Sequence, residues 1–216
     1  MKKIGKFLLF VLVMAVAMPT TYAQLNKKEL KYIEKIAKKD AKHAKKEGWK
    51  VAPDNTSMEM QLTELFKLQM QKDDNGYDKF IQGEAISVGQ SYEATLSNAE
   101  YLAKMAIADK IETLVKLNIY KNLSYNHISE RDEYLLEKSM SSFKGLIVQR
   151  LGQVIIPFKM YRELPNGNIE VRVAVLYSQA LAMEAAKDVM RAEFEKLFNE
   201  MAIDDVVKEL DNILGN

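Results

Sequence analysis

The chain has 216 residues, with 31 Lys and Arg, 30 Asp and Glu, two His and no Cys. The absence of Cys excludes disulfides, a thiol nucleophile, an iron–sulfur cluster and a thiolate zinc site. Because 48% of the residues are apolar and 28% are charged, the composition is that of a folded globular protein and not of a disordered one.

Residues 1–23 have the three parts of a secretory signal peptide. Three lysines precede an unbroken run of twelve apolar residues over 7–18. Thr21 and Ala23 are the small residues of a cleavage site, so we expect cleavage between Ala23 and Gln24. The apolar run is shorter than the roughly 20 residues that a transmembrane helix needs, which disfavours a membrane anchor. The sequence therefore predicts export, and the short lysine-led signal indicates a bacterium.

The next segment, 24–50, is predicted to form a basic amphipathic helix. It contains ten lysines against four acidic residues, a net charge of +6, whereas the remainder of the chain, 51–216, carries −8. Two interpretations stay open: the helix lies on the body with its lysines in water, or residues 24–47 attach to an anionic membrane surface. The lysines that we expect to face such a surface are Lys35, Lys38, Lys39, Lys42, Lys45 and Lys46.

A helix, a turn and a strand follow. Apolar residues recur at helical spacing over 58–71, after side chains that can cap a helix. Residues 73–76 (DDNG) are predicted to form a plain turn, since the sequence after them does not continue as a calcium-binding loop. Phe80–Gly89 is predicted to be a strand, in which Gly83 and Gly89 mark a bulge or a close approach of another backbone.

The middle of the chain is predicted to be helical. A long helix over 91–118 carries a stripe of small and then larger apolar residues, and we expect it to be the central helix against the sheet. A polar loop over 120–128, which includes His127, follows it. Ser129 is the expected cap of a further helix whose apolar face continues to Leu151.

A β-hairpin is the strongest local signal. Strands over 154–162 and 169–177 flank Asn166-Gly167, a pair suited to the positive φ angles of a hairpin turn. Pro157 lacks an N–H and indicates an edge position or a bulge. Helices over 179–199 and 203–214 complete the chain.

The predicted fold class is α+β. We expect a small antiparallel or mixed sheet with a C-terminal β-hairpin, packed against several helices and preceded by the long basic helix. Because no linker or repeat interrupts 51–216, that stretch is predicted to be one domain.

No catalytic constellation is recognisable. The two histidines, His43 and His127, lie in polar surroundings, and neither a Gly-x-Ser-x-Gly turn nor a phosphate-binding loop is present. We therefore predict no enzyme activity, no cofactor and no metal. Nucleic acid is not an expected partner, because the chain is predicted to be exported and its basic segment has no Arg.

Residues 80–180 resemble a family of small bacterial envelope lipoproteins, which includes the twenty-kilodalton membrane-associated lipoprotein and domains of flagellar assembly proteins P and T. The resemblance lies in Gly83-Glu84-Ala85, the alanines of 94–106, the helix around 139–142, and the hairpin Lys159-Met160-Tyr161 with 166–173. It implies an α+β fold and a non-enzymatic envelope protein that assembles with partners. The chain departs from the family in having no lipid-attachment Cys.

Export and the resemblance together predict a non-enzymatic protein of the periplasm or cell envelope of a Gram-negative bacterium. Its expected role is structural or in protein interaction, with an envelope protein as partner. The alternative is an exported ligand-binding module, and an envelope hydrolase comes third. The sequence does not predict the oligomeric state.

Overall fold

The computed structural model of the chain describes residues 25–53, 55–123 and 130–197. The predicted signal peptide with its Ala23–Gln24 cleavage site, the loop residue His127, the Ser129 cap and the helix over 203–214 all lie outside these ranges. No described helix is long and apolar enough to cross a bilayer.

The fold is α+β, as predicted: five described helices accompany one three-stranded antiparallel sheet. In chain order the elements are α1 (Lys27–Lys46), α2 (Met58–Gln69), β1 (Phe80–Gly89), α3 (Tyr92–Leu123), α4 (Glu130–Arg150), β2 (Ile155–Glu163), β3 (Ile169–Ser178) and α5 (Gln179–Leu197). The strand order is β1-β3-β2, so the last strand of the chain is the central one.

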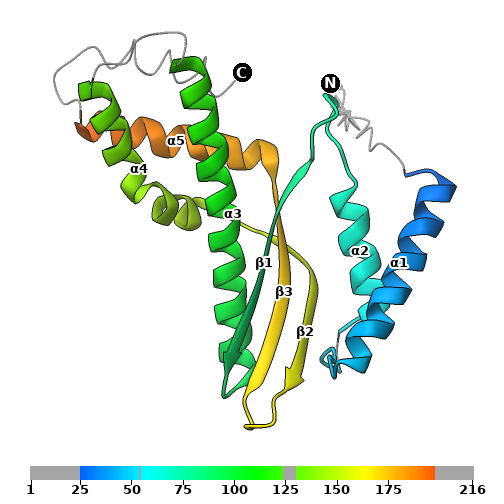
Figure 1. Cartoon of the computed structure of the whole chain (residues 1–216). Coiled ribbons are helices and arrows are strands. Elements are labelled where there is room, and N and C mark those ends of the chain that lie inside the picture. Colours follow the sequence, from blue (N-terminus) through cyan, green and yellow to red (C-terminus); the bar gives the residue numbers. More distant parts are fainter. Residues whose placement is uncertain (1–24, 54, 124–129, 198–216) are drawn as a thin grey trace, which may run out of the picture.

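Helices cover both faces of the sheet (Figure 1). α3 lies along one face, over β1 and β3. α4 and α5 pack around the C-terminal half of α3. On the other face α2 lies against β2, and α1 packs on the outside of α2. Because both faces are covered, β3 is buried at Val171 and throughout 173–177.

The approach of α3 to the sheet depends on Gly83. A Cβ at this position would overlap the backbone carbonyl of Ala103 and come within 2.9 Å of Ile107 Cγ1. Of the two predicted alternatives for the β1 glycines, close approach is therefore correct at Gly83, and the register of β1 against β3 runs without a bulge from Phe80↔Ser178 to Gly89↔Ile169. The expectation of a central helix over 91–118 is confirmed.

The hairpin prediction is also confirmed. β2 and β3 pair antiparallel around a turn in which Gly167 has φ of +80° and donates its N–H to the carbonyl of Leu164 at 2.9 Å. The register shifts between Ile155 and Phe158, around Pro157, and β2 is an edge strand. Both structural consequences expected of Pro157 are thus present.

Two helix ends differ from prediction. α2 ends at Gln69 and not at Gln71, and α3 continues to Leu123, so residues 120–123 are helical where a loop was expected. The physical reason for the longer α3 is that neither Gly nor Pro occurs between Gly89 and Gly145, so nothing in the sequence stops the helix at 118.

The 73–76 turn is confirmed. The Asp73 carboxylate accepts the N–H groups of Asn75 (2.9 Å) and Tyr77 (2.8 Å), and Gly76 has φ of +83°.

Candidate functional site

The predicted basic helix is present as α1, and its start is well defined. The Asn26 side chain accepts the N–H groups of Lys28 (2.9 Å) and Glu29 (3.0 Å), and the Glu29 carboxylate accepts the Asn26 N–H at 2.7 Å. This reciprocal capping box satisfies donors that a helix N-terminus otherwise leaves free. The capping box therefore fixes the start of the helix after Asn26.

A narrow apolar stripe sets the rotation of α1 about its axis. Ile33, Ala37 and Ala41 are buried, and α1 packs chiefly against α2. Ala37 and Ala41 share a core cluster with residues of α2 and with Phe158 and Met160 of β2. The structure thus shows the helix lying on the body, which was one of the two predicted arrangements, and this arrangement leaves the opposite side of α1 in solvent.

The lysines gather on that solvent side. At about 100° per residue, all nine lysines of α1 fall within an arc of about 120°. Glu29, Glu34 and Asp40 lie outside this arc. We call the following residues the lysine face: Lys27, Lys28, Lys31, Lys35, Lys38, Lys39, Lys42, Lys45 and Lys46. The six lysines predicted to contact an anionic surface all belong to it, so the structure brings them together.

The lysine face carries a net excess of positive charge. All nine side chains are exposed, and none forms an ion pair with another described residue. A helix of 20 residues is about 30 Å long, so neighbouring lysines lie within a Debye length of one another and act as one extended positive field. His43 lies outside the lysine face and forms an (i, i+4) contact with Glu47, at 3.0 Å between Nε2 and Oε1.

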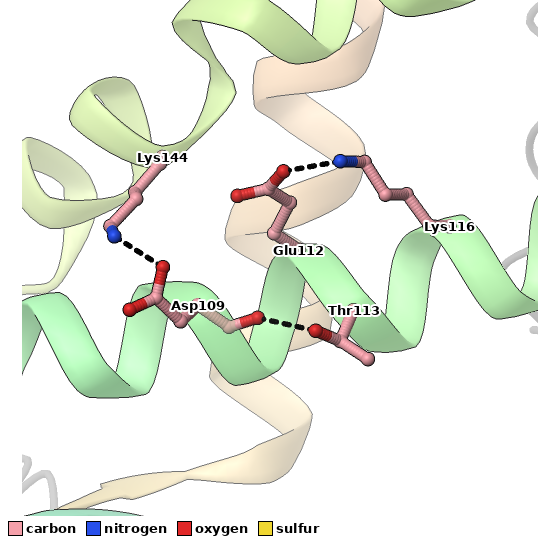
Figure 2. Close-up of polar contacts among 5 residues, drawn as sticks. All are labelled: Asp109, Glu112, Thr113, Lys116 and Lys144. Carbon is pink, nitrogen blue, oxygen red and sulfur yellow. Dashed lines mark hydrogen bonds and ion pairs between the residues drawn. The ribbon is translucent and has the colours of Figure 1, made fainter.

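Charges elsewhere in the molecule are arranged differently. In Figure 2 the α3 carboxylates of Asp109 and Glu112 each meet a lysine: Lys144 reaches Asp109 from α4, and Lys116 reaches Glu112 within α3 at 2.6 Å. Thr113 Oγ1 donates to the Asp109 carbonyl at 2.8 Å, which ties the same turn of the helix to itself. These pairs join α3 to α4 or brace α3, so they are structural contacts and leave little net charge.

Two hollows open beside β1. The larger, of about 690 Å³, lies at the start of β1 beside α3, and the smaller, of about 250 Å³, lies between the α1–α2 layer and the sheet. Gln69 and Gln82 line both, and their hydrogen-bonded side chains separate one hollow from the other. The smaller hollow has an apolar wall that includes Trp49 and Phe158, with the Arg172–Glu84 ion pair beside it.

The hollows hold no arrangement of groups that defines a chemistry. In the larger one, Lys110 Nζ donates to the Gln82 carbonyl at 2.7 Å, and Asp109 is paired with Lys144. Among the described residues, no three His, Asp or Glu side chains lie close enough to hold a metal ion, and no buried side-chain N or O lacks a hydrogen-bond partner. Sequence reasoning missed both hollows, because their walls come from several elements that are distant in the chain and no local pattern marks them.

Comparisons with protein-family models, with curated proteins and with solved structures found no match to this chain. The resemblance to the envelope lipoproteins therefore stays a prediction.

Proposed function

We propose that this chain is a non-enzymatic interaction protein of the cell envelope, which binds an anionic membrane surface through the lysine face of α1. The observation that supports it most directly is the segregation of nine exposed lysines, none of them in an ion pair with a described residue, on the side of α1 that faces away from the body. The predicted export signal supplies the location, and the α+β body is free to contact a protein partner of the envelope.

The proposed binding is electrostatic and reversible. Each Lys close to an anionic bilayer contributes about 1 kcal/mol, and the attraction falls off within a Debye length. The apolar stripe of α1 is already occupied, since Ile33, Ala37 and Ala41 are buried in the fold. The helix would therefore rest on the lipid headgroups without inserting, and no lipid anchor is needed to hold it there.

Vesicle co-sedimentation tests this proposal. The protein is mixed with vesicles of phosphatidylcholine containing phosphatidylglycerol, and with vesicles of phosphatidylcholine alone, at low and at high salt. We expect sedimentation only with the anionic vesicles and only at low salt. A variant with Gln at Lys35, Lys38, Lys39, Lys42, Lys45 and Lys46 should bind more than 100-fold more weakly, since about six contributions of 1 kcal/mol are removed.

The matched control carries Arg at the same six positions. It keeps the charge, so it should sediment as the unchanged protein does. Substitution is a sharper test than deletion of α1, because deletion would uncover the buried side of α2. If the unchanged protein never sediments with anionic vesicles, or if the Gln variant sediments equally well, the proposed membrane contact is wrong.

A further inference from the structure

The rest of the chain covers the β2 edge of the sheet and leaves most of the β1 edge uncovered. At the β2 edge, Tyr161 exchanges both backbone hydrogen bonds with Lys50, at 2.7 and 2.9 Å, and the Lys159 N–H donates to Gln61 Oε1 at 2.9 Å. Pro157, in the same strand, has no N–H to offer. The β2 edge is thus closed to further strands, as edges in soluble proteins commonly are.

The β1 edge is open over most of its length. The Gln179 N–H donates to the Lys79 carbonyl at 2.9 Å, so Lys79 is a hydrogen-bonded position at the start of the β1–β3 ladder. Because such positions alternate along antiparallel strands, the odd-numbered residues of β1 are the ones whose backbone groups bond to β3. The even-numbered residues therefore direct their N–H and C=O groups outward. Lys110 covers the Gln82 carbonyl, but the backbone groups of Glu84, Ile86 and Val88 have no outward partner among the described residues.

The side chains of the same residues favour pairing of this edge with another strand. Ile86 is 50% exposed and Val88 is 49% exposed, on the sheet face that carries α1 and α2. Glu84, the only charged residue of β1, is already paired with Arg172 of β3. The strand has ten residues, no proline and no bulge, so its length and backbone geometry leave it able to pair with another strand.

We infer that β1 pairs with β1 of a second copy of this chain, antiparallel and about a two-fold axis at Ile86. Among the registers that match outward-facing residues, only this one pairs all three open residues, Glu84, Ile86 and Val88, with one another. A two-fold axis at Glu84 would place two carboxylates directly opposite each other, which is destabilising. With the axis at Ile86, the two Ile86 side chains face each other and each Glu84 lies opposite the Val88 of the other copy, so the half-exposed apolar residues cover one another.

The dimer would contain one continuous six-stranded sheet. Antiparallel pairing within a sheet keeps the same face of both copies on the same side, so both α1 helices would lie on one side of the dimer. The two lysine faces could then meet one flat anionic surface together, and the second contact would be strengthened by its high effective concentration. Only this consequence depends on the proposed function; the pairing of β1 does not.

Because the chain contains no Cys, single-cysteine variants test the register directly. Under mild oxidation, Ile86→Cys should yield a disulfide-linked dimer, since directly opposite Cα atoms lie within disulfide reach. Glu84→Cys and Val88→Cys are matched controls: each alone should crosslink at least 10-fold less, whereas an equal mixture of the two should crosslink with each other. Equal crosslinking at all three positions would contradict the inferred register.

Analytical ultracentrifugation tests the edge independently. Ile86→Pro removes an outward N–H that the β1–β3 ladder does not use, so it should weaken dimerisation at least 100-fold while circular dichroism stays native. Ile86→Val keeps the N–H and should remain dimeric. If the protein is monomeric up to its solubility limit, the inference is wrong, and the β1 edge would then be a site for an extended segment of another protein. A dimer that survives in natively folded Ile86→Pro also overturns it, and if that variant does not fold, the cysteine series decides.

Discussion

The two faces of the sheet differ in how tightly they are packed. On the α3 face, Val171, Val173 and Val175 are fully buried, and Gly83 lets the backbone of α3 approach the strand directly. On the α1–α2 face, the apolar layer is smaller, and it shares its space with the Arg172–Glu84 pair and a hollow of about 250 Å³. The larger core includes α3, α4 and α5, whereas the other contains only the α1–α2 layer over β2 and β3.

This difference indicates a division of roles between the layers. The α3 face supplies most of the buried apolar surface that stabilises the fold. The α1–α2 face supports the lysine face on a smaller core, and its outermost helix packs chiefly on one neighbour. We therefore expect α1 and α2 to open at a lower free energy than α3 and β3, as peripheral units of native proteins generally do.

The largest predicted effect is on the tightly packed face. Gly83→Ala should lower the free energy of unfolding by about 3 kcal/mol or more, because the new methyl group overlaps a backbone carbonyl that can move only if α3 moves. Urea denaturation measures this. Gly145→Ala is the control, since a Cβ there meets nothing within 4 Å and replacing a helical Gly should stabilise by up to about 1 kcal/mol. Equal effects of the two substitutions would contradict the close approach of α3.

A smaller and more local effect is predicted for the α1–α2 face. Ala41→Glu places a carboxylate at a position that is 2% exposed, and it should lower the opening free energy of α1 by about 2 kcal/mol or more. Amide exchange of α1 should accelerate while that of α3 changes little. Lys42→Glu, at the exposed neighbouring position, is the control and should leave α1 docked. Loss of protection throughout α3 in Ala41→Glu would show that the two faces are not independent.

The smallest effect is predicted for the ion pair on the α1–α2 face. Arg172 and Glu84 are both more than one third exposed, so their coupling should be at most about 1 kcal/mol and should decrease with salt. A double-mutant cycle with Arg172→Met and Glu84→Gln measures it. A coupling well above this value at high salt would mean that the pair is shielded from solvent and that this face is packed more like the other.

The sequence predicted the elements whose signals are local. The Asn166-Gly167 turn, the basic amphipathic helix and the small residues of α3 each specify structure through neighbouring residues, and each was found in the expected place. The end of α3 was placed too early, because Asn and Ser at 118–126 suggested a loop while no Gly or Pro forced the helix to stop.

Features that depend on tertiary contacts could not be predicted. The burial of β3 on both faces was concealed by its alternating pattern, since Arg172 is polar yet lies within a strand that is otherwise almost entirely covered. The closure of the β2 edge joins Lys50 to Tyr161 across more than a hundred residues, and the open β1 edge becomes visible only after β3 is known to be central.

The central position of β3 has a consequence for the order in which the chain can fold. β3 is completed only at Ser178, yet it is the pairing partner of both β1 and β2 and contributes to both core clusters. The helices and β1 are thus synthesised long before the strand against which they pack, and their contacts with β3 are distant in sequence. A nascent chain of this design remains without a complete sheet until most of it has been made, and the transition to the native state is expected to be late and cooperative.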